Sequence, residues 1–265
     1  MILNKLYKYH KNGRLEYEGD YRNNKKYGEG ILYDNLGNLL YKGLFNNDKK
    51  NGYGKLFKNN KLIYEGLFKD DIKIEGTLYF KNNCKLKGIF KNDILVKGDY
   101  YINDKIQYRG EFKNNIYHGK GQSYDSKGVI RYIGEFCNNK MSGTGKLYDK
   151  FKNLKYSGFF IDNKLNGFCE EYHDNGKIKH KGSYKLNKKN GFGFIFNKKG
   201  HLIFKGFFKD DLKNGIGMII TKNKMIKGNY IDNKKEGVFE IWKKEFKNYY
   251  DNNENKYNIR KRKKE

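Results

Sequence analysis

The sequence contains no proline, only three cysteines and a single tryptophan. Proline removes a backbone hydrogen-bond donor and is excluded from the interior of sheets, so its absence suits a chain built almost entirely of strands and tight turns. Cys84, Cys137 and Cys169 are far apart and form no CxxC pair. This spacing argues against a disulfide framework or a zinc site, and it favours a reducing intracellular compartment.

Long apolar runs are also missing. No stretch approaches the roughly 18 apolar residues of a transmembrane helix. The opening residues, MILNKLYKYHK, lack the apolar core of a signal peptide, and residue 2 is isoleucine rather than the glycine that N-myristoylation requires. Neither a carboxylate pair nor a Ser/His/Asp or Cys/His set stands out, and the five histidines are scattered. We therefore expect a non-enzymatic cytoplasmic protein with no cofactor and no metal.

What the chain does have is a ladder of glycines with a period of 22 to 24 residues. The glycines are Gly19, Gly43, Gly66, Gly88, Gly110, Gly134, Gly158, Gly182, Gly206 and Gly228. Around Gly134, the stretch YIGEFCNNKMSGTGKLY alternates like a strand, reaches an Asn-Asn-Lys turn and returns as a second strand. The ladder predicts an array of about ten antiparallel β-hairpins. The fold class is therefore all-β, an elongated single-layer solenoid in which each repeat buries its face against its neighbours.

An aromatic residue stands two positions after every one of these glycines. These ten residues are Tyr21, Phe45, Phe68, Phe90, Phe112, Phe136, Phe160, Tyr184, Phe208 and Tyr230. A tyrosine usually stands two positions before the glycine as well, so the rings and the glycine share one face of a strand. Stacked in register, the rings predict a continuous aromatic spine. The spine is either the core of the array or the lining of a binding groove.

A second glycine follows nine residues after the first in eight repeats, and ten residues after it at Gly76 and Gly98. Six repeats complete a Gly-x-Gly, for example at Gly119 and Gly121. No third glycine and no helical pattern follow, so a phosphate-binding loop is not expected. A backbone position with positive φ, or close packing, explains these glycines better. The Gly66 and Gly88 repeats lack Gly-x-Gly and have short joins, which indicates degeneracy or a bend in the array.

The repeat pattern sets three regions. Residues 1–16 resemble the second half of a repeat and are expected to cap the array, which occupies residues 17–242. Residues 243–265 form a basic helix or tail, because Trp242, Phe246, Tyr249 and Tyr250 fit one face of a helix. The final basic run consists of Arg260, Lys261, Arg262, Lys263 and Lys264.

The formal net charge is +27, from 57 basic and 30 acidic residues. Such an excess predicts attraction to anionic lipids, nucleic acids or acidic proteins. Few of the basic residues are arginine, and asparagine is abundant beside lysine, so a compositional bias explains the excess equally well.

The unit Tyr-x-Gly-x-[Phe/Tyr], followed by Gly-x-Gly, resembles the MORN (membrane occupation and recognition nexus) repeat. The match is visible in YEGDYRNNKKYGEG (17–30), YRGEFKNNIYHGKG (108–121) and YIGEFCNNKMSGTG (132–145), and it covers residues 6 to 242. Departures are the missing second glycines at Leu78, Tyr100, Cys169 and Phe239. The resemblance implies a twisted single-layer sheet of hairpins with a groove on one side. It also implies a scaffold associated with membranes, phosphoinositides or cytoskeletal structures.

Three functions follow from these features. The first is a non-catalytic scaffold that binds a peptide or helix of a protein partner in its groove, at a membrane or cytoskeletal structure. The second is direct binding to anionic phospholipid through the lysines and the run from Arg260 to Lys264. An antitoxin-like hairpin-repeat protein is a further alternative, and its repeats would contain less Gly-x-Gly. We do not expect nucleic acid as a partner, because most aromatics occupy structural repeat positions. Partner identity and oligomeric state are left open.

Overall fold

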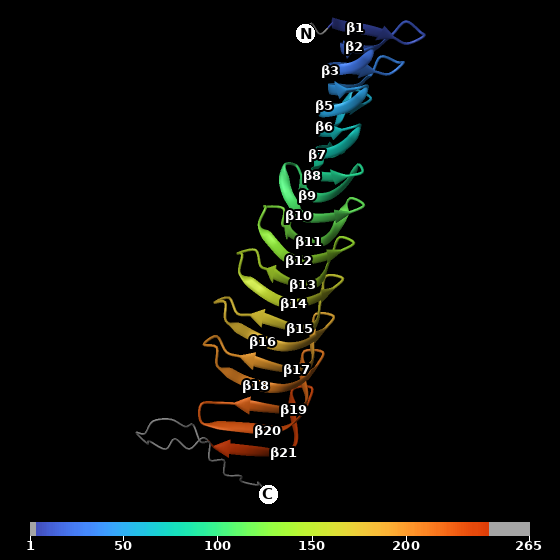
Figure 1. Ribbon diagram of the computed structural model, residues 1–265. Helices are drawn as coiled ribbons and strands as arrows, with labels where there is room; N and C mark the ends of the chain where they lie inside the picture. Colours follow the sequence, from blue (N-terminus) through green and yellow to red (C-terminus); the bar gives the residue numbers. More distant parts are fainter. Residues whose placement is uncertain (1–3, 244–265) are drawn as a thin grey trace. The chain divides into compact units, whose positions relative to one another are not determined.

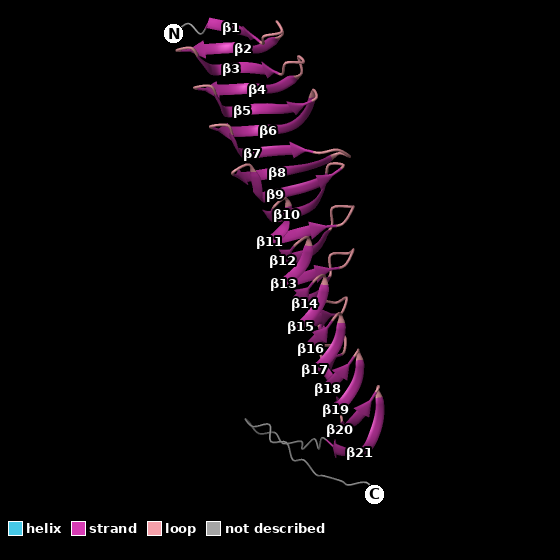
Figure 2. Ribbon diagram, turned by 90° about the vertical axis from the view of Figure 1, so that its right-hand side faces the viewer, coloured by secondary structure: helices cyan, strands magenta, loops and turns pink. Residues whose placement is uncertain are grey.

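The computed structural model describes residues 4–243, and every regular element in this range is a β-strand. The strands are joined by short loops (Figure 2). The chain divides into an N-terminal unit, residues 1–130, and a C-terminal unit, residues 131–265. Within each unit the strands follow one another in chain order, and each pairs antiparallel with the next (Figure 1). The predicted all-β fold of about ten antiparallel hairpins is confirmed.

The N-terminal unit contains eleven strands. They are β1 (Asn4–Tyr9), β2 (Leu15–Arg22), β3 (Lys25–Tyr33), β4 (Leu39–Asn46), β5 (Lys49–Lys58), β6 (Lys61–Lys69), β7 (Ile72–Tyr79), β8 (Cys84–Lys91), β9 (Ile94–Ile102), β10 (Lys105–Lys113) and β11 (Ile116–Tyr124). Strand β1 pairs with β2 through Leu6 and Gly19. The first residues therefore extend the sheet by a strand, as the half-repeat at residues 1–16 predicts.

The C-terminal unit is built from ten strands, the first of which starts at the boundary. They are β12 (Ile130–Cys137), β13 (Lys140–Tyr148), β14 (Leu154–Ile161), β15 (Lys164–Tyr172), β16 (Ile178–Lys185), β17 (Lys188–Phe196), β18 (Leu202–Lys209), β19 (Leu212–Ile220), β20 (Lys224–Ile231) and β21 (Lys234–Lys243). Trp242 lies in β21 opposite Met225, so the predicted helix does not begin there. Phe246, Tyr249 and Tyr250 lie outside the described residues.

Two-residue turns close the hairpins. In the hairpin of β12 and β13, Asn138 has φ 51° and Asn139 has φ 64°. Two successive residues with positive φ are the mark of a type I′ turn, whose twist matches that of the strands it joins. Asparagine and aspartate tolerate this conformation best among residues other than glycine. The Lys/Asn-rich composition therefore has a structural role at the turns, and Lys140 belongs to the strand rather than to the turn.

Each of several turns is tied to the turn one repeat earlier. The backbone N–H of Asp211 donates to the carbonyl of Lys189 at 3.0 Å, and the Asp211 carboxylate accepts the N–H of Lys189 at 2.9 Å. Asn163 binds Met141 and Asp48 binds Lys26 in the same reciprocal way. We call this arrangement the turn ladder. It satisfies backbone groups that the strands leave open at the hairpin ends.

The aromatic rings pack on one face of the sheet, here called the ring face. In the Gly134 repeat, Tyr132 is fully buried and Phe136 is 5% exposed, and their ring centroids lie 5.1 Å apart in an edge-to-face arrangement. The ring of Tyr132 also contacts Phe160 of the following repeat at 5.2 Å. Tyr17, Phe45 and the rings after them interlock similarly in the N-terminal unit. The rings thus join one repeat to the next, and edge-to-face pairs add to the energy of burial.

Paired glycines make room for these rings. Gly134 lies opposite Gly145 on the neighbouring strand, and a Cβ at either position would collide with the Tyr132 side chain. The Tyr132 hydroxyl donates to the carbonyls of Glu135 and Thr144 at 3.2 and 3.4 Å. Burial raises the pKa of this hydroxyl to about 12. The first glycine of each Gly-x-Gly, such as Gly143 with φ 75°, occupies the irregular backbone beside the pair.

The register corrects one prediction from the sequence. The sequence pattern indicates that Leu78 and Tyr100 replace the second glycine in the Gly66 and Gly88 repeats, but both repeats have this glycine. Gly76 lies directly opposite Gly66, and Gly98 lies opposite Gly88, because the intervening segment is one residue shorter than in the other repeats. Cys169 does replace the glycine opposite Gly158, as expected.

Candidate binding surface

The ten aromatics predicted as core or groove residues are core. Nine of them are at most 6% exposed and Tyr21 is half-buried. A partner cannot reach them without opening the sheet, so their contribution to binding is to hold the sheet in shape. The second predicted site, the basic run from Arg260 to Lys264, lies outside the described residues.

The opposite face of the sheet, here called the open face, carries the accessible side chains. Two rows run across its strands, on either side of the paired glycines. The charged row contains the residue before each first glycine and its cross-strand partners, for example Lys42 and Lys55. The apolar row contains the residue after that glycine and its partners, for example Tyr53 and Leu67. Side chains alternate between the two faces of a strand, so neither row contributes to the ring-face core.

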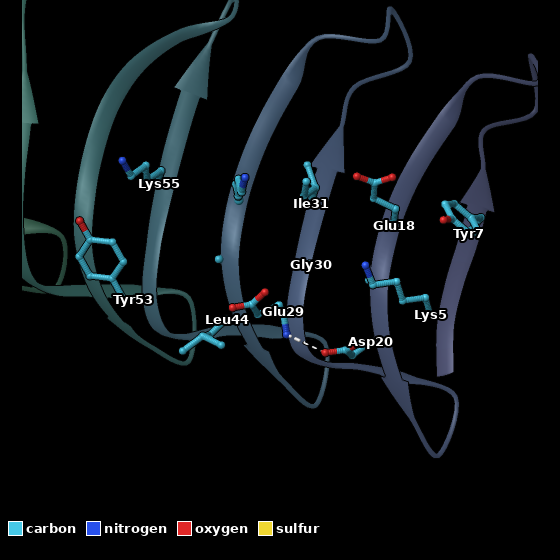
Figure 3. A pocket seen from close by; sticks show the side chains of 13 residues that line it. Lys5, Tyr7, Glu18, Asp20, Glu29, Gly30, Ile31, Leu44, Tyr53 and Lys55 are labelled. Carbon is cyan, nitrogen blue, oxygen red and sulfur yellow. Dashed lines mark hydrogen bonds between the residues drawn. The ribbon is translucent and has the colours of Figure 1, made fainter. Parts of the chain in front are cut away.

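In the N-terminal unit the open face is hollowed over β1 to β5. The hollow has a volume of about 540 Å³, and the backbone of Gly19, Gly30 and Gly43 lies between its two rows of side chains. Figure 3 shows its lining, in which lysines stand among carboxylates. The Asp20 carboxylate accepts the backbone N–H of Glu29 at 3.1 Å, which orients one wall of the hollow.

Ion pairs link neighbouring strands along the charged row of the N-terminal unit. The Arg109 guanidinium makes two hydrogen bonds of 2.8 Å with Asp99, and this pairing holds the pKa of Asp99 below its usual value. The Tyr79 hydroxyl, 2.5 Å from Glu65, lowers the pKa of that carboxyl, and Lys55 at 3.3 Å adds to the effect. Bidentate pairs of this type fix the side chains more firmly than isolated surface ion pairs do.

In the C-terminal unit the apolar row becomes a stripe of large side chains, here called the apolar stripe. It consists of Phe159 on β14, Phe168 on β15, Phe192 on β17, Phe207 on β18 and Ile216 on β19, with Ser183 on β16 between them. The five apolar side chains are between 42% and 58% exposed. Single exposed apolar residues are ordinary, but five of them on six neighbouring strands, interrupted only at Ser183, form the kind of patch that marks an interaction site.

One repeat has a polar cluster on the ring face. His180 stands where most repeats have tyrosine, and Glu171 stands beside it in a row that elsewhere holds mostly aliphatic residues. His180 is 1% exposed, and neither of its ring nitrogens has a hydrogen-bond partner among the described residues. Burial lowers the pKa of His180 to about 4, so the imidazole is neutral near pH 7. Burial alone would raise the pKa of Glu171, but Lys179 at 2.6 Å and Lys189 at 3.4 Å outweigh it and lower that pKa.

Residues 4–243 contain no cluster of three or more His, Cys, Asp or Glu side chains that could hold a metal ion. Burial raises the pKa of the Cys169 thiol, which disfavours the reactive thiolate. Within the same range no helix could cross a membrane. What the accessible surface offers is a set of charged and apolar rows suited to binding.

Sequence reasoning missed the apolar stripe, although a signal for it exists. Phe159 and Phe207 each stand directly after a repeat glycine, between two residues of the ring face. A strand with one buried face normally places polar residues at such positions. Apolar residues at the polar positions of an alternating strand would therefore have identified the second face.

The chain is similar to a known family of repeat proteins. The sequence profile of the MORN repeat matches six stretches, at residues 17–35, 41–61, 108–129, 132–150, 156–178 and 204–224. The matched stretches lie in both units, and each has an aromatic residue two positions before and two after its first glycine. Five of the six also have paired glycines, the exception being residues 156–178, where Cys169 lies opposite Gly158. The repeats outside them depart most, for instance by Leu86 or His180 in place of the tyrosine. A search of curated protein sequences finds no match to the chain.

Proposed function

Because the chain is a MORN-repeat protein, we propose that it is a non-catalytic scaffold that binds a segment of another protein across the open face of its sheet. MORN repeats generally take part in association with proteins or membranes. The proposed setting is cytoplasmic, at the periphery of a membrane or a cytoskeletal structure.

The observation that carries the proposal is that large apolar side chains are buried on the ring face but exposed on the open face. The buried rings of residues 4–243 lie on the ring face, yet the apolar row of the open face still holds large side chains. Tyr53 is 50% exposed, Leu67 is 44% exposed and Ile89 is 50% exposed in the N-terminal unit. These side chains do not support the ring-face core, and burying them against a partner would stabilise a complex by about 25 cal/mol for each Å² of apolar surface.

Site-directed photo-crosslinking tests the proposal. A photoreactive phenylalanine analogue replaces Tyr53, Leu67 or Phe207 on the open face, one at a time, in cells that contain the protein. We expect adducts with the same partner protein from these positions. The matched control is Leu186, which is 58% exposed but lies in a hairpin turn, and it should give no such adduct. Equal adducts from Leu186, or none from the open face, would contradict the proposal.

Direct binding to anionic lipid is the second candidate, and the observation that favours it is the net charge of +27. Exposed lysines attract an anionic bilayer at short range, with an energy of about 1 kcal/mol for each residue that reaches the surface. Crosslinks from the open face to lipid rather than to protein would favour this second function.

A further inference from the structure

We propose that the apolar stripe of the C-terminal unit docks an acidic amphipathic helix of a partner protein. This inference deepens the proposed scaffold function and rests on it. The stripe is an apolar surface whose side chains are about half-exposed and aligned across neighbouring strands. They are Phe159, Phe168, Phe192, Phe207 and Ile216. Three independent features decide what fits it, namely its pitch, its gap and its charge.

The pitch favours a helix lying across the strands. Neighbouring strands are about 4.8 Å apart, so the six strands from β14 to β19 present a stripe about 24 Å long. One turn of a helix rises about 5.4 Å, and about 16 residues span this length. An extended peptide repeats its side chains on one face about every 6.7 Å, so it would fall out of step with the strands after two or three positions. A helix drifts by only about 3 Å over the whole stripe.

The gap is at Ser183, between Phe168 and Phe192. Phe168 on β15 lies directly opposite Ser183 on β16. On the other side of Ser183, the next residue of the apolar stripe is Phe192 on β17. The small serine leaves a notch between two rings, and a large side chain from the partner can enter it. Buried anchors of this kind dominate binding energies. The phenylalanines lie partly against the sheet rather than projecting fully from it, which suits a partner that brings its own side chains to the stripe better than it suits a bilayer.

The charge specifies acidic side chains on the flank of the helix. Beside the stripe, the charged row carries Lys146, Lys181, Lys205 and Lys227. Lys181 pairs with Glu170 at 3.1 Å, and its ammonium lies 5.6 Å from the ring centre of Phe168. Glu170 is the one carboxylate on the open face of β14 to β19. Lys205 has only Phe194 and Met218 as cross-strand partners, so glutamates on a docked helix would supply its opposing charge. Lys146 and Lys227 lie on the strands that flank the stripe, and Lys227 is opposite Glu240 on β21.

The test uses the full chain and a fluorescein-labelled 18-residue peptide, with leucine at positions i, i+3, i+4 and i+7 of a glutamate-rich background. A permuted peptide of identical composition has no apolar face. Fluorescence anisotropy should show that the first peptide binds and the permuted one binds at least about tenfold more weakly. The double variant Phe192→Ser/Phe207→Ser should weaken binding of the first peptide at least about tenfold.

The matched control is Phe151→Ser/Leu186→Ser, two exposed apolar side chains in turns of the same unit, which should leave the affinity within about twofold. Circular dichroism of both variants checks that the sheet is intact, since all four side chains are exposed. Reversing charge with Lys181→Glu/Lys205→Glu, on β16 and β18, should weaken binding at least about fivefold and flatten its salt dependence.

Other occupants of the stripe give different results. Binding to vesicles of phosphatidylcholine with phosphatidylserine that is lost in Phe192→Ser/Phe207→Ser, with no peptide binding, would overturn the proposal in favour of a bilayer. A dimer that the same variant dissociates would overturn it in favour of a second copy. Equal binding of both peptides would reduce it to non-specific attraction by charge. Open-face crosslinks to a protein, combined with any of these failures, would leave the scaffold function standing without the helix.

Discussion

Replacing His180 by tyrosine should remove an acid-sensitive step from the unfolding of the C-terminal unit. His180 is buried, its ring nitrogens have no hydrogen-bond partner in the described structure, and its pKa is lowered from 6.5 to about 4. The lowered pKa means that the unfolded chain binds a proton more readily than the folded one. The contribution of neutral His180 to the free energy of unfolding is complete above the pKa of histidine in the unfolded chain. It is lost as the pH falls towards the lower pKa of His180 in the folded protein.

The magnitude follows from the two pKa values. Between about pH 7 and about pH 5, protonation of the unfolded state should lower the free energy of unfolding by about 2 kcal/mol. In His180→Tyr this loss should disappear. The tyrosine hydroxyl can reach backbone carbonyls as that of Tyr132 does, which should add about 1 kcal/mol at neutral pH.

Urea titrations followed by circular dichroism, together with hydrogen exchange at the amides of Gly182 and Gly193, measure the effect globally and locally. His201→Gln, in an exposed turn, is the control and should keep the wild-type pH profile. The pKa of Glu171 is also lowered, so the stabilisation by its ionised carboxylate is lost only below the ordinary pKa range of glutamate. This loss should occur in the His180→Tyr and His201→Gln variants alike. The same pH dependence for the wild type and His180→Tyr down to about pH 5 would refute the reasoning.

Two further predictions concern stability and charge. Phe136→Ala should lower the free energy of unfolding by roughly 3–5 kcal/mol because the ring is buried, whereas Lys140→Ala should change it by less than about 0.5 kcal/mol; equal urea midpoints would contradict this. Truncation after Asn258 should weaken sedimentation with anionic liposomes several-fold at about 0.15 M salt and leave the circular dichroism unchanged, because clustered charge survives screening better than dispersed charge. Unchanged sedimentation would place any lipid contact on the array.

The hairpins could be predicted from the sequence because their signals are local. A turn such as Asn138-Asn139 needs only two residues that tolerate positive φ, and the alternation beside it fixes which side chains share a face. The turn alone would place Gly143 opposite Gly134, and the register shift between Gly134 and Phe136 makes Gly145 the partner instead. The same reasoning put Gly76 and Gly98 out of register, because the length of a bulge does not show in the spacing of glycines alone.

The choice between core and groove could not be made from the sequence. Phe136 and Phe207 are both aromatic residues in alternating strands, yet the first is 5% exposed and the second is 48% exposed. Burial depends on whether a neighbouring repeat covers the side chain, and Phe136 is covered because the twin glycines let rings approach. The reciprocal bonds of Asp211 and Lys189 were hidden for the same reason: they join residues 22 apart through geometry that no local pattern reveals.

The turn ladder also bears on how such a protein can change its length. In the ladder, the turn at Asp211 holds the start of the strand that follows the preceding turn, and the turn at Asn233 holds Lys213 in the same manner. If a complete repeat within one unit is duplicated, each new turn finds an equivalent backbone group one repeat away, and no existing bond loses its partner. Deletion of a complete repeat has the same property, whereas loss of half a repeat leaves one turn without its acceptor. Whole repeats are therefore the natural increments by which the binding surface can be lengthened or shortened, by gene duplication or by a protein engineer.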